Sequence, residues 1–155
     1  IDFLVFLTGS QPIEVQTRDV ANAGRYSGDN VILSLSFANG SQGTITYVAN
    51  GSSSFSKERI EVFGGNSVAV LEDFRRCELI RNGKKKTLRS ILRQDKGHNG
   101  EWQAFANAIK NKDEAPIPFE EIVASTLTTL RALDSRASGN SEPINTAEFI
   151  RSCVS

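Results

Sequence analysis

The stretch Val31-Ile32-Leu33-Ser34-Leu35-Ser36-Phe37-Ala38-Asn39-Gly40-Ser41-Gln42-Gly43-Thr44-Ile45-Thr46-Tyr47-Val48 predicts one well-defined piece of the fold. Its first part alternates apolar and more polar residues, which is the period of a strand with one face turned toward a core. Asn39-Gly40 favours a type I′ turn, because both central residues of that turn need a positive φ. The β-branched run after it favours a second strand. The stretch therefore predicts an antiparallel hairpin.

Working outward, further short apolar runs are separated by turn residues. Gly64-Gly65-Asn66 and Asn82-Gly83 are typical hairpin connections, and the basic run 84–89 suits a charged edge that resists aggregation, more than it suits a phosphate site. Connections this short favour antiparallel pairing, since parallel neighbours need crossovers of about a dozen residues. With the hairpin, we expect an open, mostly antiparallel sheet of about six strands, the others lying at 13–20, 59–63, 68–74 and 77–81.

Toward the C-terminus the apolar period becomes helical. Trp102, Phe105, Ala106 and Ile109 recur at helical spacing, and we expect this stripe to face the core. A second stripe follows Pro118, which suits the start of a helix, and Gly139 suits its end. Both helices are expected to cover one face of the sheet, which gives a single α+β domain over residues 1–155. The second stripe consists of Phe119, Ile122, Val123, Leu127 and Leu130.

Composition excludes several classes of partner. The chain holds 18 basic and 18 acidic residues, so no net field attracts nucleic acid or an anionic membrane. No apolar run of membrane-spanning length occurs, and we expect a soluble, cytoplasmic protein. Cys77 and Cys153 have no spacing that suits zinc and are expected to be reduced thiols, although a disulfide between them stays open. The sequence predicts no metal site.

An ordered set of short motifs runs through nearly the whole chain. Together they resemble the C-terminal domain of the Gfo/Idh/MocA family of NAD(P)-dependent oxidoreductases, which has a glyceraldehyde-3-phosphate dehydrogenase-like fold. The motifs are Phe6-Leu7-Thr8-Gly9, Ser36-Phe37-Ala38-Asn39-Gly40-Ser41-Gln42-Gly43, Phe55-Ser56-Lys57-Glu58-Arg59-Ile60-Glu61-Val62-Phe63-Gly64, Lys96-Gly97-His98 with Glu101 and Phe105, Pro116-Ile117-Pro118-Phe119 and Ser125-Thr126-Leu127.

The resemblance implies that the cofactor half and the proton-transferring residues lie outside this sequence. The family's Rossmann domain has no counterpart here, and no Gly-x-Gly-x-x-Gly follows a strand. Its Glu-Lys-Pro lysine and the histidine of its Asp-x-x-x-His pair are expected upstream of Ile1, and Asp2 matches the position next to that histidine. We therefore expect this chain alone to be inactive and to bind no cofactor. In the full-length protein the resemblance implies NAD or NADP and hydride transfer to or from a CH–OH group of a sugar or polyol.

Four residues are candidates for substrate contact. A neutral imidazole at His98 can exchange hydrogen bonds with hydroxyls or a carboxylate, and its place ahead of the Trp102 helix is expected to keep it off the apolar stripe. Lys96 shares that segment and can pair with an anionic group. Lys57 and Arg59 are two apart, which puts them on one face of a strand, although ion pairs with Glu58 or Glu61 are at least as strong an alternative. Tyr47 and Trp102 are expected in the core more than on a sugar.

The uncovered sheet face leads to an expectation about assembly. With helices on one side only, the mixed apolar and polar rows of the other side would stay exposed in a monomer. We therefore expect a homodimer, or a dimer-based tetramer, formed through the sheet face. The alternative to the enzyme is a non-enzymatic, sheet-based binding or assembly module.

Overall fold

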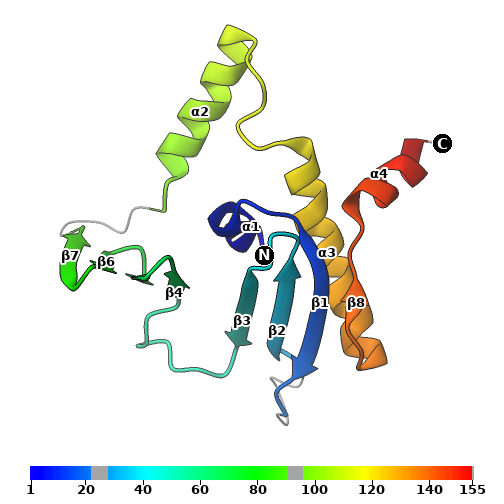
Figure 1. The fold of residues 1–155 in the computed structure, drawn as a ribbon, viewed down its shortest axis with the longest axis horizontal. Helices are drawn as coiled ribbons and strands as arrows, with labels where there is room; N and C mark the ends of the chain where they lie inside the picture. The colour runs from blue at the N-terminus through cyan, green and yellow to red at the C-terminus, as the bar shows by residue number, and fades with distance from the viewer. Residues whose placement is uncertain (22–27, 91–95, 155) are drawn as a thin grey trace. The chain divides into compact units, whose positions relative to one another are not determined.

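The computed structural model describes residues 1–21, 28–90 and 96–154, and the chain divides into two compact units (Figure 1). The first unit consists of Ile1–Asn50 and Glu114–Ser155, and the second of Gly51–Asp113. Each holds one four-stranded antiparallel sheet. In chain order the elements are α1 (Asp2–Thr8), β1 (Pro12–Asp19), β2 (Asn30–Phe37), β3 (Gln42–Val48), β4 (Arg59–Gly64), β5 (Ser67–Glu72), β6 (Arg76–Arg81), β7 (Lys84–Arg89), α2 (His98–Asn111), α3 (Phe119–Ser138), β8 (Glu142–Pro143) and α4 (Thr146–Val154).

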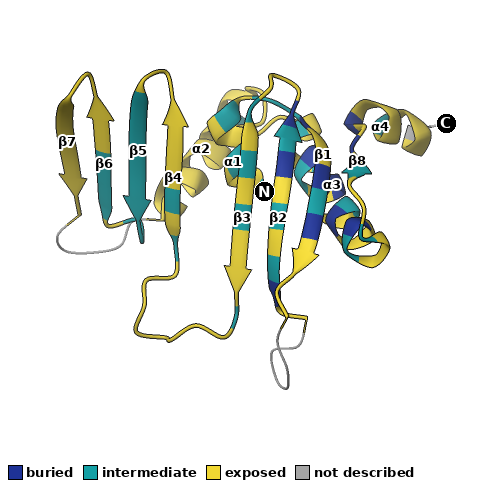
Figure 2. Cartoon of the chain, turned by 60° about the horizontal axis from the view of Figure 1, so that its bottom comes forward, coloured by how far each residue is buried: buried dark blue, intermediate teal, exposed yellow. Residues whose placement is uncertain are grey.

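The sheet of the first unit has the strand order β3-β2-β1-β8. Val15 pairs with Leu35, and Leu35 with Gly43, so these three residues share one face. The face is covered by α3, which packs along β1. Figure 2 shows that the buried positions concentrate on β1, β2 and α3. The core consists of Val5, Val15, Leu35, Phe37, Leu127, Ala132 and Ile144.

Helix α3 turns its small residues toward the sheet. Its buried residues are Ala124, Leu127, Thr128, Ala132 and Ser135. The stripe expected from the sequence is therefore wrong in all but Leu127, because Phe119, Ile122 and Leu130 are exposed and Val123 is only partly buried. Small side chains allow the helix backbone to lie close to β1, and this approach decides which side of the helix is buried.

Two polar contacts hold the ends of α3 to its neighbours. The Ser125 hydroxyl donates to Asp2 Oδ1 at 3.3 Å, which ties the first turn of α1 to α3. Where β1 extends past its pairing with the short strand β8, the Thr17 N–H donates to Ser135 Oγ at 2.9 Å. The Ser135 hydroxyl in turn donates to the Asn140 carbonyl at 2.5 Å. Ser135 thus satisfies a backbone donor at the edge of β1 that no strand pairs.

The predicted hairpin is present, with a different turn. Strands β2 and β3 pair from Asn30↔Val48 to Ser36↔Gln42. Of the two central residues, only Gly40 has a positive φ, at 85°, so the turn is not type I′. Instead, the Phe37 N–H donates to the Ser41 carbonyl. The loop between these two residues is one residue longer than the two-residue loop of a type I′ hairpin. Tyr47 is exposed on β3, which corrects the expectation that it packs in the core.

The second unit contains a four-stranded meander in the order β4-β5-β6-β7. Gly65-Asn66 and Asn82-Gly83 close two of its hairpins, and all four residues have the positive φ that a type I′ turn requires. The third connection is unusual, because Asp73 and Phe74 also have positive φ values of 50° and 52°. The strand expected over 68–74 therefore ends at Glu72.

Helix α2 follows in the same unit and buries none of its residues. Trp102 is 71% exposed, and Phe105 and Ile109 are more than half exposed. The expectation that this stripe, Trp102 included, faces a core is therefore wrong for the described chain. The α+β, open antiparallel class is nevertheless confirmed, with the strands divided between two sheets.

Candidate functional site

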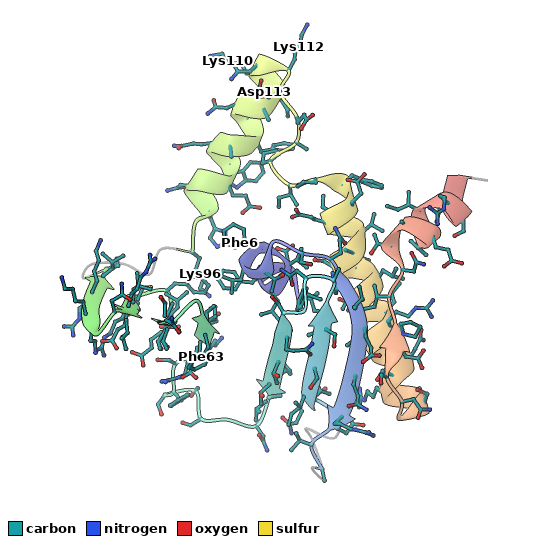
Figure 3. The ribbon with its side chains drawn as sticks, viewed as in Figure 1. Phe6, Phe63, Lys96, Lys110, Lys112 and Asp113 are labelled. Atoms are coloured by element: carbon teal, nitrogen blue, oxygen red, sulfur yellow. The ribbon has the colours of Figure 1, made fainter. Side chains whose placement is uncertain are left out.

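Lys96 lies at the centre of a small charged cluster in the second unit (Figure 3). Its ammonium is 2.9 Å from Glu58 Oε1 and lies over the Phe74 ring, 5.9 Å from the ring centroid. The backbone supports this arrangement, since the Asp73 N–H donates to the Glu58 carbonyl at 2.7 Å. The cluster thus joins the segment before β4, the β5–β6 turn and the segment that leads into α2.

The β5–β6 turn places Phe74 beneath the ammonium at a conformational cost. A positive φ is rare for a bulky residue such as phenylalanine. Asp73, directly before Phe74, also has a positive φ. Backbone conformations of this kind persist only where surrounding contacts impose them. Here the contacts are the Glu58 carbonyl bond and the cation–π contact with Lys96.

The electrostatics of the cluster favour the ionised form of Glu58. The hydrogen bond from Lys96 lowers the pKa of the Glu58 carboxyl below its ordinary value, and the positive charge of Lys57 acts in the same direction. Partial desolvation opposes both effects without reversing them. The Lys96 ammonium is therefore already paired with a carboxylate, and an anionic ligand would compete with Glu58 for it.

Arg59 is held in a second set of ion pairs. Its guanidinium is 2.6 Å from Glu61 Oε1 and 3.1 Å from Glu72 Oε1. The bond to Glu61 raises the pKa of Arg59 above its ordinary value. Lys57 precedes the strand and makes no ion pair within the described part of the chain. Of these two residues, Lys57 is the one whose charge is available to an incoming anion.

His98 is the first residue of α2, and its side chain is 75% exposed. Its Nδ1 atom lies 3.9 Å from Glu101 Oε2, which is too long for a hydrogen bond. Because His98 is four residues before Trp102, the two side chains share one face of the helix. The expectation that His98 lies off the stripe is wrong: by helical spacing the imidazole, the indole and the Phe105 ring lie on the same side of α2, and all three are exposed.

The structure therefore brings two of the four predicted residues together. Lys96 and Lys57 both act on Glu58, whereas Arg59 belongs to the ion pairs on the sheet and His98 to the helix. The expected ion pair between Arg59 and Glu61 is present, whereas sequence reasoning missed the pairing of Glu58 with Lys96 and the part played by Phe74. Glu58 and Lys96 are 38 positions apart, and Asp73-Phe74 carries none of the glycine or asparagine signals that mark a tight turn.

Residues 1–21, 28–90 and 96–154 lack two further features. No group of three or more His, Cys, Asp or Glu side chains could hold a metal ion there. No helix in the same residues is long and apolar enough to cross a bilayer.

Comparison with known proteins finds likeness in structure alone. No protein-family model matches the sequence, and no curated protein is significantly similar to it. The fold matches an NAD-binding oxidoreductase from Klebsiella pneumoniae (TM-score 0.79, 15% identity, 93% of this chain and 48% of that one). It also matches an oxidoreductase from Agrobacterium radiobacter in complex with NAD+, L-tartaric acid and magnesium (TM-score 0.76, 14% identity, 96% and 47%).

A third match is to an aldose-aldose oxidoreductase from Caulobacter crescentus complexed with glycerol (TM-score 0.74, 11% identity, 92% and 44%). The chain thus spans less than half the length of each of these three structures. At such identities the likeness shows the fold, and the fold implied by the family resemblance is confirmed.

Proposed function

We propose that this chain is the C-terminal domain of a Gfo/Idh/MocA-type NAD(P)-dependent oxidoreductase, in which it forms a wall of the substrate pocket and joins subunits. One observation carries the proposal: more than nine tenths of the chain matches less than half of several oxidoreductases. The two units together make up that match, which supports their working as one domain. The cofactor is NAD or NADP, bound by a Rossmann half, and the chain works in the cytoplasm.

The substrate of the intact enzyme is a sugar or polyol. The Caulobacter structure is of an aldose-aldose oxidoreductase, and the exposed row on α2 has the right composition to meet such a ligand. An aromatic face can pack on the C–H face of a sugar ring, and an imidazole beside it can exchange hydrogen bonds with hydroxyls. His98 is therefore the leading substrate contact, with Lys57 and Lys96 as cations for an anionic substituent. Arg59 ranks last because two carboxylates hold it.

The test is catalysis by the intact enzyme, assayed by nicotinamide absorbance over a panel of aldoses and polyols. His98→Ala should lower kcat/KM by about tenfold or more, because a hydrogen bond to the substrate is lost. Gln103→Ala is the matched control, since Gln103 is exposed on the same helix and points away from the His98 row. Equal kinetics for the two variants would remove His98 from the site.

The isolated chain supplies a second test. We expect calorimetry with NAD and NADP to show no binding tighter than about 100 μM, since no dinucleotide motif is present. Binding of that strength would contradict the assignment of the cofactor to another domain. If the intact protein oxidised no sugar or polyol at all, the alternative of a sheet-based binding or assembly module would replace the enzyme.

A further inference from the structure

Strand β7 forms one edge of the second sheet and has β6 as its strand neighbour. All six of its residues are exposed, and Figure 2 shows it at the outer side of that sheet. Within the described part of the second unit, no strand pairs with its outer side. An edge of this kind presents unpaired N–H and C=O groups on which another strand can form.

The register shows which residues of β7 present these groups. The Ser90 N–H donates to the Arg75 carbonyl at 2.8 Å, so Ser90 and Arg75 form a hydrogen-bonded pair at the end of the ladder. Such pairs alternate with non-hydrogen-bonded pairs along two antiparallel strands. The β7 residues that bond to β6 are therefore Lys84, Lys86 and Leu88. The residues whose N–H and C=O groups point outward are Lys85, Thr87 and Arg89.

The side chains of β7 give this edge a strong positive charge. Four of its six residues are basic and none is acidic. Lys85 is paired with Glu78 at 2.7 Å. The other three basic residues make no ion pair among the described residues; they are Lys84, Lys86 and Arg89. Because like charges on neighbouring strands are destabilising and opposite charges are stabilising, the edge disfavours β7 of a second copy and favours an acidic strand.

We propose that the β7 edge binds an extended, acidic segment of another protein, which adds to the sheet as a fifth, antiparallel strand. Main-chain hydrogen bonds to the outward groups of β7 give affinity, and the side chains on either side of the edge give specificity. The proposal goes beyond the oxidoreductase function and does not depend on it.

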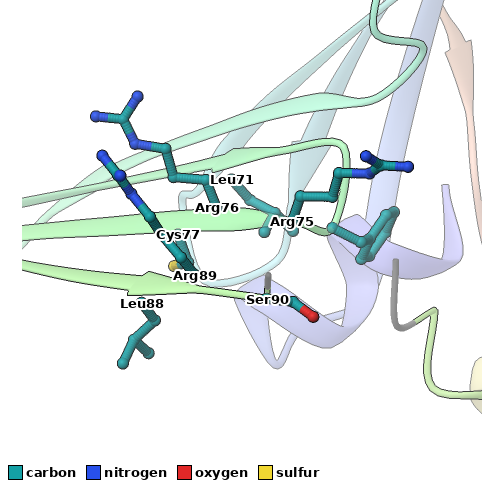
Figure 4. A pocket seen from close by; sticks show the side chains of 8 residues that line it. Leu71, Arg75, Arg76, Cys77, Leu88, Arg89 and Ser90 are labelled. Carbon is teal, nitrogen blue, oxygen red and sulfur yellow. The ribbon is translucent and has the colours of Figure 1, made fainter. Parts of the chain in front are cut away.

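The side chains along β7 set the sequence that such a segment needs. Successive side chains of a strand lie on opposite sides of the sheet, as Figure 4 shows for Leu88 and Arg89. Leu88 borders a hollow that Leu71 and Cys77 also line, so an apolar residue suits the position opposite Leu88. Acidic residues suit the positions opposite the three basic residues that make no ion pair.

The same groups fit nucleic acid less well. A phosphate group offers acceptors and no donors, so it would leave the outward carbonyls of β7 without partners. The cations also lie on both sides of the sheet, with Lys84 and Lys86 on one side and Arg89 on the other. They therefore form no single row along a phosphate backbone. An extended peptide supplies N–H and C=O groups at the spacing of a strand.

A terminally blocked, fluorescein-labelled peptide of sequence Glu-Leu-Thr-Glu-Thr-Glu tests the proposal. In antiparallel alignment its first residue lies opposite Arg89 and its last opposite Lys84. Fluorescence anisotropy with the full chain should show binding about tenfold or more tighter than that of Lys-Leu-Thr-Lys-Thr-Lys. Equal affinity of the two peptides, or no binding of the acidic one, would overturn the proposal.

Two N-methylated forms of the acidic peptide separate strand addition from attraction by charge. Methyl groups on its third and fifth nitrogens, opposite Thr87 and Lys85, remove donors that point to β7 and should abolish binding. Methyl groups on the second and fourth nitrogens remove donors that point away from β7, and should lower affinity by less than about threefold. Equal losses with the two forms would show a contact through charge alone and would contradict a fifth strand.

Matched variants of the protein locate the contact. Lys86→Glu should weaken binding of the acidic peptide by about fivefold or more, because it places like charges opposite each other. Lys110→Glu makes the same change of charge on α2, in the same unit, and should leave binding unchanged. Circular dichroism checks that both variants fold.

Two results would assign the charge of this unit differently. An equal effect of Lys110→Glu would mean that the peptide is attracted by the unit as a whole and not by β7. A single-stranded DNA oligonucleotide that bound as tightly as the peptide, and lost affinity in Lys86→Glu, would make β7 a phosphate site. Either result would overturn the peptide proposal. The kinetics of the intact enzyme test the oxidoreductase function separately, so each proposal can fail without the other.

Discussion

The two sheets have the same number of strands and the same antiparallel pairing, yet among residues 1–21, 28–90 and 96–154 only the first sheet has a buried core. In the first unit α3 covers the apolar face, and Val15, Leu35 and Phe37 are fully enclosed. In the second unit no described residue is buried, and the stability of its sheet draws on hairpin turns and surface ion pairs. Strand pairing alone therefore does not make a core. A sheet also needs a layer over its apolar face.

The largest expected effect contrasts two phenylalanines. Phe37→Ala should lower the free energy of unfolding by about 3–5 kcal/mol, because it leaves a cavity in the core of the first unit. Phe63→Ala in β4 of the second sheet should change the free energy of unfolding by less than about 0.5 kcal/mol, since Phe63 is 71% exposed. Urea denaturation followed by circular dichroism measures both. Similar losses would mean that the second sheet is covered as fully as the first.

A smaller effect concerns the contact between α3 and β1. Ser135→Ala should cost about 1–3 kcal/mol, because the Thr17 N–H would be buried without a partner. Ser125→Ala is the control on the same helix; its hydroxyl makes an exposed bond to Asp2, so the cost should be below about 1 kcal/mol. Hydrogen exchange of the Thr17 amide localises the change. Unaltered exchange in Ser135→Ala would show that another acceptor serves Thr17.

Much of the fold could be predicted from the sequence because turn chemistry is local. Gly65-Asn66 and Asn82-Gly83 marked the hairpins of the second unit correctly, and the strand period located β1 and β2. The buried side of α3 could not be predicted in the same way. Two sets of residues recur on that helix at helical spacing, one large and one small, and hydrophobicity favours the large set. Close approach to β1 requires the small set, and that distance is a tertiary property.

The candidate site was predicted only in part, for a similar reason. The residue types at Lys57, Lys96 and His98 indicated polar contacts, but an ion pair between Lys96 and Glu58 depends on the fold that brings them together. The pairing of Arg59 with Glu72 depends on the β4–β5 register. The chemistry of a side chain indicates that a residue can make a polar contact. Which residue it contacts depends on the strand register and on the turns, and these cannot be predicted from residue type.

Two glycines should respond with opposite signs. Gly139 ends α3 with a φ of 76°, so Gly139→Ala should destabilise the first unit by about 1 kcal/mol. Gly100 lies in the first turn of α2 with open space at its Cβ position, so Gly100→Ala should stabilise that helix by about 0.5–1 kcal/mol. Thermal unfolding measures the first effect, and amide exchange along α2 the second. Destabilisation by both variants would indicate that α2 packs closely on another surface at Gly100.

The last contrast is in the response to acid. Hydrogen bonds from Lys96 and Lys85 lower the pKa values of Glu58 and Glu78 respectively, both in the second unit. A lowered pKa in the folded state means that the stabilisation is complete above the ordinary glutamate pKa of about 4.3 and is lost as the pH falls through the folded-state value. The buried polar residues described in the first unit include no carboxylate. Acid should therefore reduce amide protection in the second sheet before the first.

Carboxyl-carbon NMR titration tests the cause directly. Lys96→Met should raise the titration midpoint of Glu58 and leave that of Glu78 unchanged. Lys85→Met should raise the midpoint of Glu78 and leave that of Glu58 unchanged. If Glu58 titrated at its ordinary midpoint in the wild-type chain, the Lys96 pair would contribute nothing. The order of the second sheet would then depend on its hairpin turns more than on that ion pair.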